Sequence, residues 1–171
     1  MKNNLVYLLI FGLLFGCNKV KPIEKKKSKF ERVWFDTVQM IPFSSELQIN
    51  KNNTFEYKSH SCQVGSKSNG TWTIKNDTII LNSIKPKGCH FQHPFGIVCA
   101  FNKGNASKNE DNKTIKGCSP SGRDVIYEIF QNEKFYIKND TLIHINKIVE
   151  ECPHLKVVFS KYKKVRVVNL Y

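Results

Sequence analysis

The 171-residue chain carries 27 lysine and arginine residues against 14 aspartate and glutamate residues, a formal net charge of +13. Hydrophobic residues make up 40% of the chain, so it can bury a core, and its length suits one domain. A basic chain could bind nucleic acid, but no RNP-like, helix-turn-helix or zinc-finger pattern is present. We therefore expect no nucleic-acid partner, and the charge favours an anionic surface or an acidic partner.

The first 17 residues have the pattern of an export signal. Lys2 precedes an apolar run at residues 5–15, which is too short to cross a bilayer as a helix because that requires about 20 residues. The run ends in the letters LFGC at residues 14–17. This motif resembles the lipobox of bacterial lipoproteins. The resemblance implies that residues 1–16 are a cleaved signal peptide and that Cys17 is acylated and anchors the chain to a membrane.

Residues 17–29 are predicted to be a disordered tether. Six lysines stand here against one glutamate, together with a proline and few apolar side chains. Such a segment cannot bury enough surface to fold. Asn18 follows Cys17 in place of the aspartate that resembles an inner-membrane retention signal, which favours delivery to the outer membrane. The sequence leaves open whether the domain faces the periplasm or the cell surface.

From residue 30 onward the periodicity predicts strands. Apolar and polar residues alternate, as in strands with one buried face, at residues 47–49, 55–57, 72–74, 125–129, 135–137, 143–145 and 157–159. Turn-forming residues are predicted to separate these runs at 50–53, 66–70, 75–77 and 138–140. The pattern predicts a single all-β domain over residues 30–171, an antiparallel meander that forms a barrel or a sandwich.

An internal echo predicts two hairpins. The segments TWTIKNDTIILN at 71–82 and KFYIKNDTLIHIN at 134–146 share the core Ile-Lys-Asn-Asp-Thr. An alternating run enters Asn-Asp and another leaves it, and these residues tolerate the positive φ of tight hairpin turns. In the second copy His144 lies between Ile143 and Ile145, so we expect it on the exposed face of its strand.

The segments LQINKNNTFEYKSHSC and SNGTWTIKNDTIILNS carry a further resemblance. Over residues 45–84, with a weaker echo at 125–146, the chain is similar to small lipocalin-like envelope lipoproteins. The resemblance implies a barrel or sandwich and no catalytic residue. Residues 85–123 depart from that pattern and are predicted to be a long, cysteine-containing loop insertion.

The cysteines predict disulfides. Besides Cys17 there are five: Cys62, Cys89, Cys99, Cys118 and Cys152. Outside the inner membrane the compartment is usually oxidising, so bridges are expected. Cys118 should pair with Cys89 or Cys99, because a bridge there would brace a loop with little apolar surface, and Cys62 should pair with another cysteine. The odd number leaves one thiol over, and spacing alone does not fix the connectivity.

Metal binding and catalysis are less favoured. Histidines flank the cysteines in CHFQH at 89–93 and CPH at 152–154, so zinc or copper is an alternative to disulfides. No Cys-x-x-Cys pair supports it, and we expect neither a metal nor another cofactor. The chain also lacks a Gly-x-Ser-x-Gly elbow, a phosphate-binding glycine loop and paired carboxylates, so we do not expect an enzyme.

Two functions remain open. The first is a membrane-anchored binding module for an apolar or amphiphilic ligand, whose candidate lining is aromatic: Phe55, Tyr57, Trp72 and Tyr127. The same side chains could instead simply fill a core. The second is an envelope interaction protein, such as an inhibitor, immunity factor or assembly partner, that meets another protein through residues 85–123.

Overall fold

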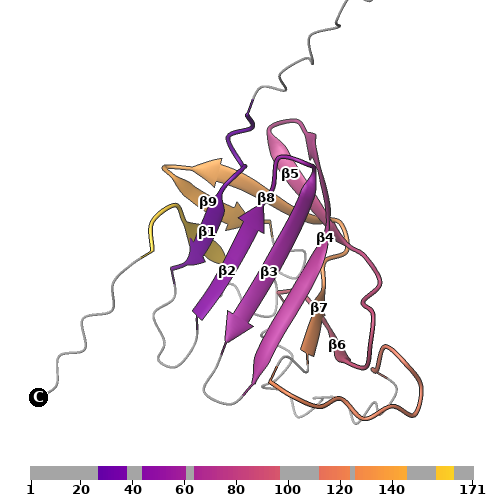
Figure 1. Ribbon diagram of the computed structural model, residues 1–171. Coiled ribbons are helices and arrows are strands. Elements are labelled where there is room, and N and C mark those ends of the chain that lie inside the picture. The colour runs from indigo at the N-terminus through magenta and orange to yellow at the C-terminus, as the bar shows by residue number, and fades with distance from the viewer. Residues whose placement is uncertain are drawn as a thin grey trace, which may run out of the picture.

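The computed structural model describes residues 27–37, 44–60, 64–96, 112–123, 126–145 and 157–163. Ten strands run through these segments (Figure 1): β1 Val33–Asp36, β2 Ser44–Ile49, β3 Thr54–His60, β4 Gly65–Lys75, β5 Thr78–Ser83, β6 Phe91–Pro94, β7 Ile126–Ile129, β8 Glu133–Lys138, β9 Thr141–His144 and β10 Val158–Ser160. None of these segments contains a helix that is long and apolar enough to span a membrane.

Eight of the strands close into an antiparallel barrel. β1 to β5 pair in chain order, β5 then pairs with β8, and β8, β9 and β10 lead back to β1. The all-β prediction is confirmed, and of the two architectures left open the chain adopts the barrel. Closure leaves these eight strands without a free edge that could pair with another chain.

β6 and β7 lie outside this ring. β7 runs parallel to the first part of β4, beside Ser66 and Lys67, and β6 runs parallel to β7. Part of the predicted loop at 85–123 is therefore a strand. We call residues 84–96, 112–123 and β7 the extension, which lies at one end of the barrel in Figure 1.

The barrel interior is filled by large apolar side chains: Phe30, Trp34, Leu47, Ile49, Phe55, Tyr57, Trp72, Ile79, Leu81, Phe95, Phe130, Phe135, Leu142 and Phe159. Aromatic rings dominate this core, and neighbouring rings such as Phe95 and Phe130 stack with their centroids 4.0 Å apart. Such pairs contribute about 0.5–1.5 kcal/mol beyond the area that they bury. The core is therefore a packed interior that extends across the barrel.

Tight turns close one end of the barrel, which we call the hairpin end. The β2–β3, β4–β5 and β8–β9 turns lie there and place asparagine or aspartate at positive φ, at Asn53, Asn76, Asp77, Asn139 and Asp140. Both hairpins that the repeated Ile-Lys-Asn-Asp-Thr predicts are present. The opposite end, where β1 and β3 finish and β2 and β4 begin, is called the far end.

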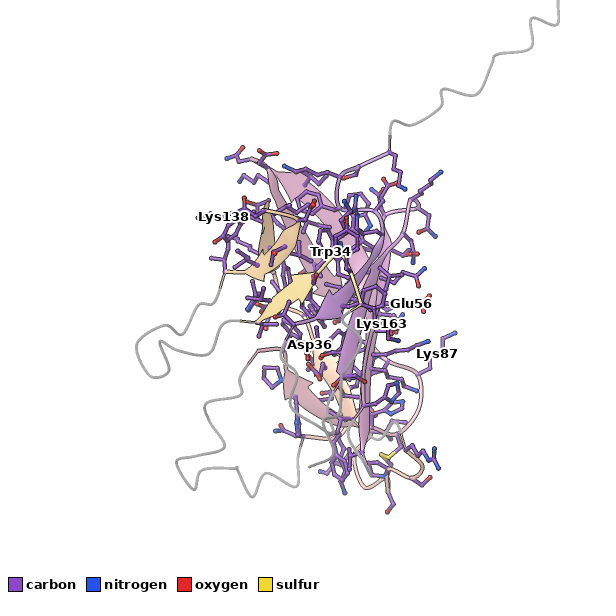
Figure 2. The ribbon with its side chains drawn as sticks, turned by 90° about the vertical axis from the view of Figure 1, so that its left-hand side faces the viewer. Trp34, Asp36, Glu56, Lys87, Lys138 and Lys163 are labelled. Atoms are coloured by element: carbon purple, nitrogen blue, oxygen red, sulfur yellow. A yellow bond between two sulfur atoms is a disulfide. The ribbon has the colours of Figure 1, made fainter. Side chains whose placement is uncertain are left out.

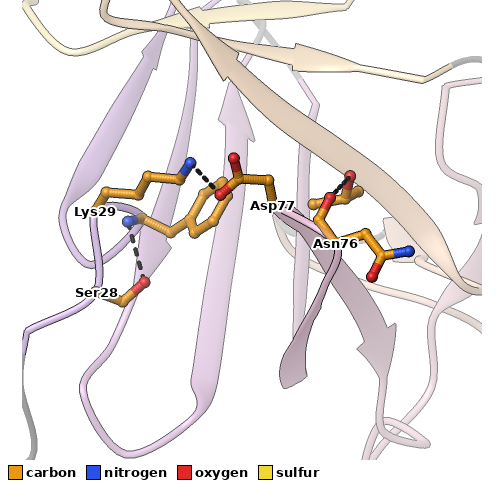
Figure 3. A network of polar contacts seen from close by, with 6 residues as sticks. Ser28, Lys29, Asn76 and Asp77 are labelled. Atoms are coloured by element: carbon orange, nitrogen blue, oxygen red, sulfur yellow. Dashed lines mark hydrogen bonds and ion pairs between the residues drawn. The ribbon is translucent and has the colours of Figure 1, made fainter.

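The N-terminal segment is fastened at the hairpin end (Figure 3). Lys29 Nζ lies 2.7 Å from Asp77 Oδ1, and the Phe30 side chain is fully buried in the core. Trp34 Nε1 donates to the Phe30 carbonyl oxygen at 2.9 Å, which holds the segment against the barrel. Contact with the barrel thus begins within the last residues of the predicted tether, while Cys17 lies outside the described residues.

One predicted turn was wrong. Residues 66–70, with the letters SKSNG, lie within β4 and pair with β3 along their whole length. Ser66 and Ser68 are buried, and a Cβ on Gly70 would lie 2.0 Å from the Asn82 carbonyl oxygen and 2.6 Å from Phe55 Cε1. These small residues allow neighbouring elements to pack closely against the strand. Because turns are also rich in small residues, the sequence of this segment looks like that of a turn.

Gly70→Ala should lower the free energy of unfolding by at least about 2 kcal/mol, because overpacked sites typically cost 1–3 kcal/mol and the nearest atom here is backbone. Urea unfolding followed by tryptophan fluorescence measures the loss. Gly117→Ala is the control. A Cβ at this position would meet open space, so only the φ of +76°, which is unfavourable for alanine, should lower stability, by about 1 kcal/mol. An equal loss in the two variants would contradict the proposed close approach.

Candidate functional site

Polar side chains gather inside the barrel toward its far end. Asp36, Ser45, Tyr57, Ser66 and Glu128 come from five different strands, and we call them the interior polar cluster. Ser45 Oγ donates to Asp36 Oδ2 at 3.2 Å, and Ser66 Oγ donates to Glu128 Oε1. Tyr57 joins the two groups, since its hydroxyl forms hydrogen bonds with Ser45 and with Glu128.

Strand alternation explains the cluster. Toward the hairpin end, β1, β2 and β3 each place an apolar side chain inward: Trp34, Leu47 and Phe55. The next inward position on each strand is Asp36, Ser45 or Tyr57, because side chains repeat on one face every two residues. The same barrel face therefore changes from apolar to polar along its length.

Burial raises the pKa of two members of the cluster, Glu128 and Tyr57, and so favours their neutral forms. Burial raises the pKa of Glu128, and the hydrogen bonds from Ser66 and Tyr57 oppose this shift only in part. Burial is also the largest cause that raises the pKa of Tyr57, followed by the negative charge of Glu128. The phenol thus keeps its proton at neutral pH and can donate it in a hydrogen bond.

A second polar pair lies in the interior. His144 Nε2 lies 2.6 Å from Glu133 Oε2, and the two side chains are only 2% and 10% exposed. The prediction that His144 is exposed was wrong, because Leu142 and His144 face inward while Ile143 and Ile145 face outward. The period of two shows which residues of a strand share a face. Because both faces of β9 carry apolar residues, it does not show which face is buried. His144 Nδ1 has no hydrogen-bond partner among the described residues.

Phe95 lies between these two polar groups. Its ring centroid is 5.5 Å from that of Tyr57 and 5.3 Å from that of His144. Phe95 follows β6, so this ring belongs to the extension and enters the interior from outside the eight-stranded wall. Gly96 follows at a φ of +79°, and a Cβ there would lie 3.2 Å from His144 Cε1.

The four aromatic residues that the sequence predicts as ligand lining do not all meet. Phe55, Tyr57 and Trp72 share the interior core. Tyr127 is buried elsewhere: its hydroxyl donates to the Ile84 carbonyl oxygen at 2.7 Å and lies 2.9 Å from the Asn69 carbonyl oxygen. These contacts place Tyr127 between β4 and the extension.

The remaining members of the site had only weak sequence signals. The sequence predicts that Tyr127 faces the interior. Because neighbouring residues of a strand face opposite sides, that prediction places Glu128 on the outer face. Phe95 lies in a segment predicted to be a loop. A glutamate within an otherwise apolar strand, as in IYEI at 126–129, was the one available signal for a buried acid.

The structure contains the disulfide Cys89–Cys118, with the two Cα atoms 5.9 Å apart. It selects Cys89 over Cys99 as the partner predicted for Cys118. Cys62, Cys99 and Cys152 lie outside the described residues. Within the described residues, no three histidine, cysteine or acidic side chains come together in a group that could hold a metal ion.

No family model matches the chain, and comparisons with curated proteins and with solved structures give no match either. The chemistry of the interior polar cluster is therefore the basis for assigning a function.

The pH dependence of stability should report on Glu128. Between the ordinary glutamate pKa of 4.5 and the raised folded-state pKa, the folded protein keeps a proton that the unfolded chain has lost. The contribution of Glu128 to stability is thus complete below pH 4.5 and declines as pH rises through this window. In Glu128→Gln this decline should be absent, which urea unfolding at a series of pH values from 4 to 8 can measure.

Glu56→Gln is the matched control for this measurement, since Glu56 is exposed on the outer face of β3. It should keep the pH dependence of the original chain. Parallel curves for the Glu128→Gln variant and the original protein would contradict the burial of an ionisable carboxyl.

Proposed function

We propose that the protein is a lipid-anchored binding module of a bacterial cell envelope, which holds an amphiphilic small molecule in its barrel and catalyses no reaction. The interior polar cluster is the observation that carries this proposal. Burying polar groups lowers stability unless they find partners, and apolar side chains of similar volume would fill a purely structural core at less cost. A cluster of five polar residues in a closed barrel is therefore better explained by recognition.

The composition of the cluster indicates the kind of polar group that it would recognise. Its members are two carboxyls and three hydroxyls, and none of them is basic. A primary amine is the group that complements this set best, because it donates several hydrogen bonds and its positive charge would favour ionised Glu128. The apolar part of the ligand would run from Tyr57 along Phe55 toward Trp72, whose Nε1 donates to the Asn50 carbonyl oxygen near the hairpin end.

Phe95 is the side chain that such a ligand would displace. Its ring contacts both Tyr57 and His144, so it occupies the region between the cluster and the second polar pair. Because Phe95 comes from the extension, its withdrawal would leave all eight barrel pairings intact. His144 Nδ1, which lacks a described partner, would then be accessible to the ligand.

The proposed location follows from the first 29 residues. The lipobox-like motif at residues 14–17 supports an acyl anchor on Cys17, and Asn18 favours the outer membrane. Lys27 is the tenth residue after Cys17, so the two lie at most about 35 Å apart in an extended chain. The tether joins the barrel at the hairpin end, so the far end and its polar cluster would point away from the membrane.

Cys17→Ser should abolish acylation. The altered chain should lack the acyl mass, because one residue supplies the whole proposed anchor, and it should keep residues 1–16, because the proposed cleavage also requires this cysteine. The intact mass of the purified chain measures both changes. Cys89→Ser is the control, since this cysteine is disulfide-bonded and should leave the acyl mass and the cleavage unchanged. An acyl mass on the Cys17→Ser chain would contradict the anchor.

Ligand binding can be tested with a dansyl-labelled long-chain amine on the chain without residues 1–17, which lacks both the apolar run and the proposed anchor and needs no detergent. Both tryptophans, Trp34 and Trp72, lie in the barrel core, so energy transfer from them reports a probe inside the barrel. Glu128→Gln should weaken binding at least tenfold, since it removes the charge that would pair with the amine. Phe95→Ala should tighten binding, because the ligand no longer has to displace the ring.

Glu56→Gln, on the outer face of β3, should leave the affinity for the probe unchanged. Equal affinity in the Glu128→Gln variant would contradict recognition by the cluster. Absence of energy transfer in both the original protein and the Phe95→Ala variant would contradict an interior site altogether.

A further inference from the structure

We propose that the extension is a docking surface for an acidic protein. This inference goes beyond the interior ligand, because it depends on the outer surface of the molecule. The described residues 84–96 and 112–123 contain five cationic residues and no aspartate or glutamate: Lys85, Lys87, Lys113, Lys116 and Arg123. Figure 2 shows Lys87 pointing outward at one side of the molecule.

The charge balance of this part of the chain is basic. At the hairpin end and on the outer barrel wall, three lysines have acidic partners in the ion pairs Lys29–Asp77, Lys161–Asp140 and Lys163–Glu46. The two described segments of the extension contain cations alone, although Glu110, Asp111 and Asp124 adjoin them in the sequence. Over residues 84–124 seven lysines and arginines stand against three acidic residues, which favours encounter with an acidic partner.

The barrel wall next to the extension increases this charge. Lys58 and Lys67 are directly opposite each other in the β3–β4 pairing, and Lys67 is aligned with Tyr127 of β7. Like charges at directly opposed positions are destabilising in a sheet. Lys58 also lies directly opposite Glu46 in the β2–β3 pairing, so Lys67 is the one of the two that adds positive charge beside the extension.

The extension also exposes apolar side chains. Ile84, Phe91 and Ile115 are 51%, 37% and 52% exposed, and all three lie among the lysines of the two segments. Protein interfaces commonly combine an apolar centre with a polar rim. This mixture fits a folded partner with both apolar and acidic residues.

Three interactions join the two described segments of the extension. The disulfide Cys89–Cys118 joins its two segments, Thr114 Oγ1 donates to the Gly88 carbonyl oxygen, and the His90 backbone N–H donates to Thr114 Oγ1 at 2.9 Å. Such bracing reduces the conformational entropy that would be lost on binding. A lysine-rich segment that served only solubility would not require it.

A protein is a better partner than the membrane that would carry the anchor. The Gly65 backbone N–H donates to the Arg123 carbonyl oxygen at the start of β4, whereas Lys29 contacts Asp77 just beyond the end of β4. β4 has 11 residues, which span about 36 Å at 3.3 Å per residue. With the tether at the hairpin end, the extension would lie on the side away from the bilayer.

Site-specific photo-crosslinking in the cells that produce the full chain tests the proposal. A photo-reactive residue at Ile115 should give a discrete protein crosslink, and one at Tyr162, which is exposed at the hairpin end, should not. The triple variant Lys85→Glu, Lys87→Glu and Lys116→Glu should reduce this crosslink at least tenfold. The matched variant Lys75→Glu, Lys134→Glu and Lys138→Glu should leave it unchanged, since these lysines are exposed on β4 and β8 away from the extension.

The crosslinked peptide, identified by mass spectrometry, should come from an acidic surface of the partner. Binding of the purified partner to the full chain should weaken at least tenfold in the first triple variant and should weaken with added salt. Unchanged crosslinking after charge reversal, or no protein crosslink at Ile115, would overturn the proposal. Lysine-dependent binding to vesicles with 30% phosphatidylglycerol, without a protein crosslink, would replace the protein with a membrane surface. Glu128→Gln should leave the crosslink unchanged, so the two proposals can fail independently.

Discussion

Closure of the barrel is the constraint on which the rest of the structure depends. The ring is completed by the pairing of β1 with β10 and of β5 with β8, which joins residues far apart in the sequence. Once it is closed, the inward side chains lose most of their contact with water. The same alternation that buries Phe55 therefore buries Tyr57, and burial also raises the pKa of Glu128.

The local features of the fold could be predicted because they depend on neighbouring residues. Asn76 and Asp77 indicate a turn by their tolerance of positive φ, and the alternation on either side indicates two paired strands. The same reasoning failed at residues 66–70, where the small residues serve the packing of Gly70 against Asn82 and Phe55. Turns and close approaches between strands both favour small residues. Only contacts with distant parts of the chain therefore distinguish a turn from a closely packed strand.

The candidate site could be predicted only in part, for a different physical reason. Tyr57 was identified because it alternates with exposed residues on β3. Glu128 and Phe95 were missed because their inward direction depends on where β6 and β7 join the barrel. His144 shows the same limit, since its burial depends on Glu133, a partner on the neighbouring strand β8. Long-range contacts of this kind leave no periodic signal in the sequence.

The fold also separates charges that the sequence mixes. Glu31 and Glu133 are buried and Asp36 and Glu128 are half-buried, while most lysines remain on the outside. The acidic residues that face inward cannot form surface ion pairs with these lysines, so the outer surface is more basic than the sequence balance indicates. The same folding event thus gives the interior its carboxyls and leaves the lysines of the extension on the outer surface. The two proposed binding surfaces differ accordingly: the interior holds carboxyls, of which Glu128 has a pKa raised by burial, and the extension presents cations.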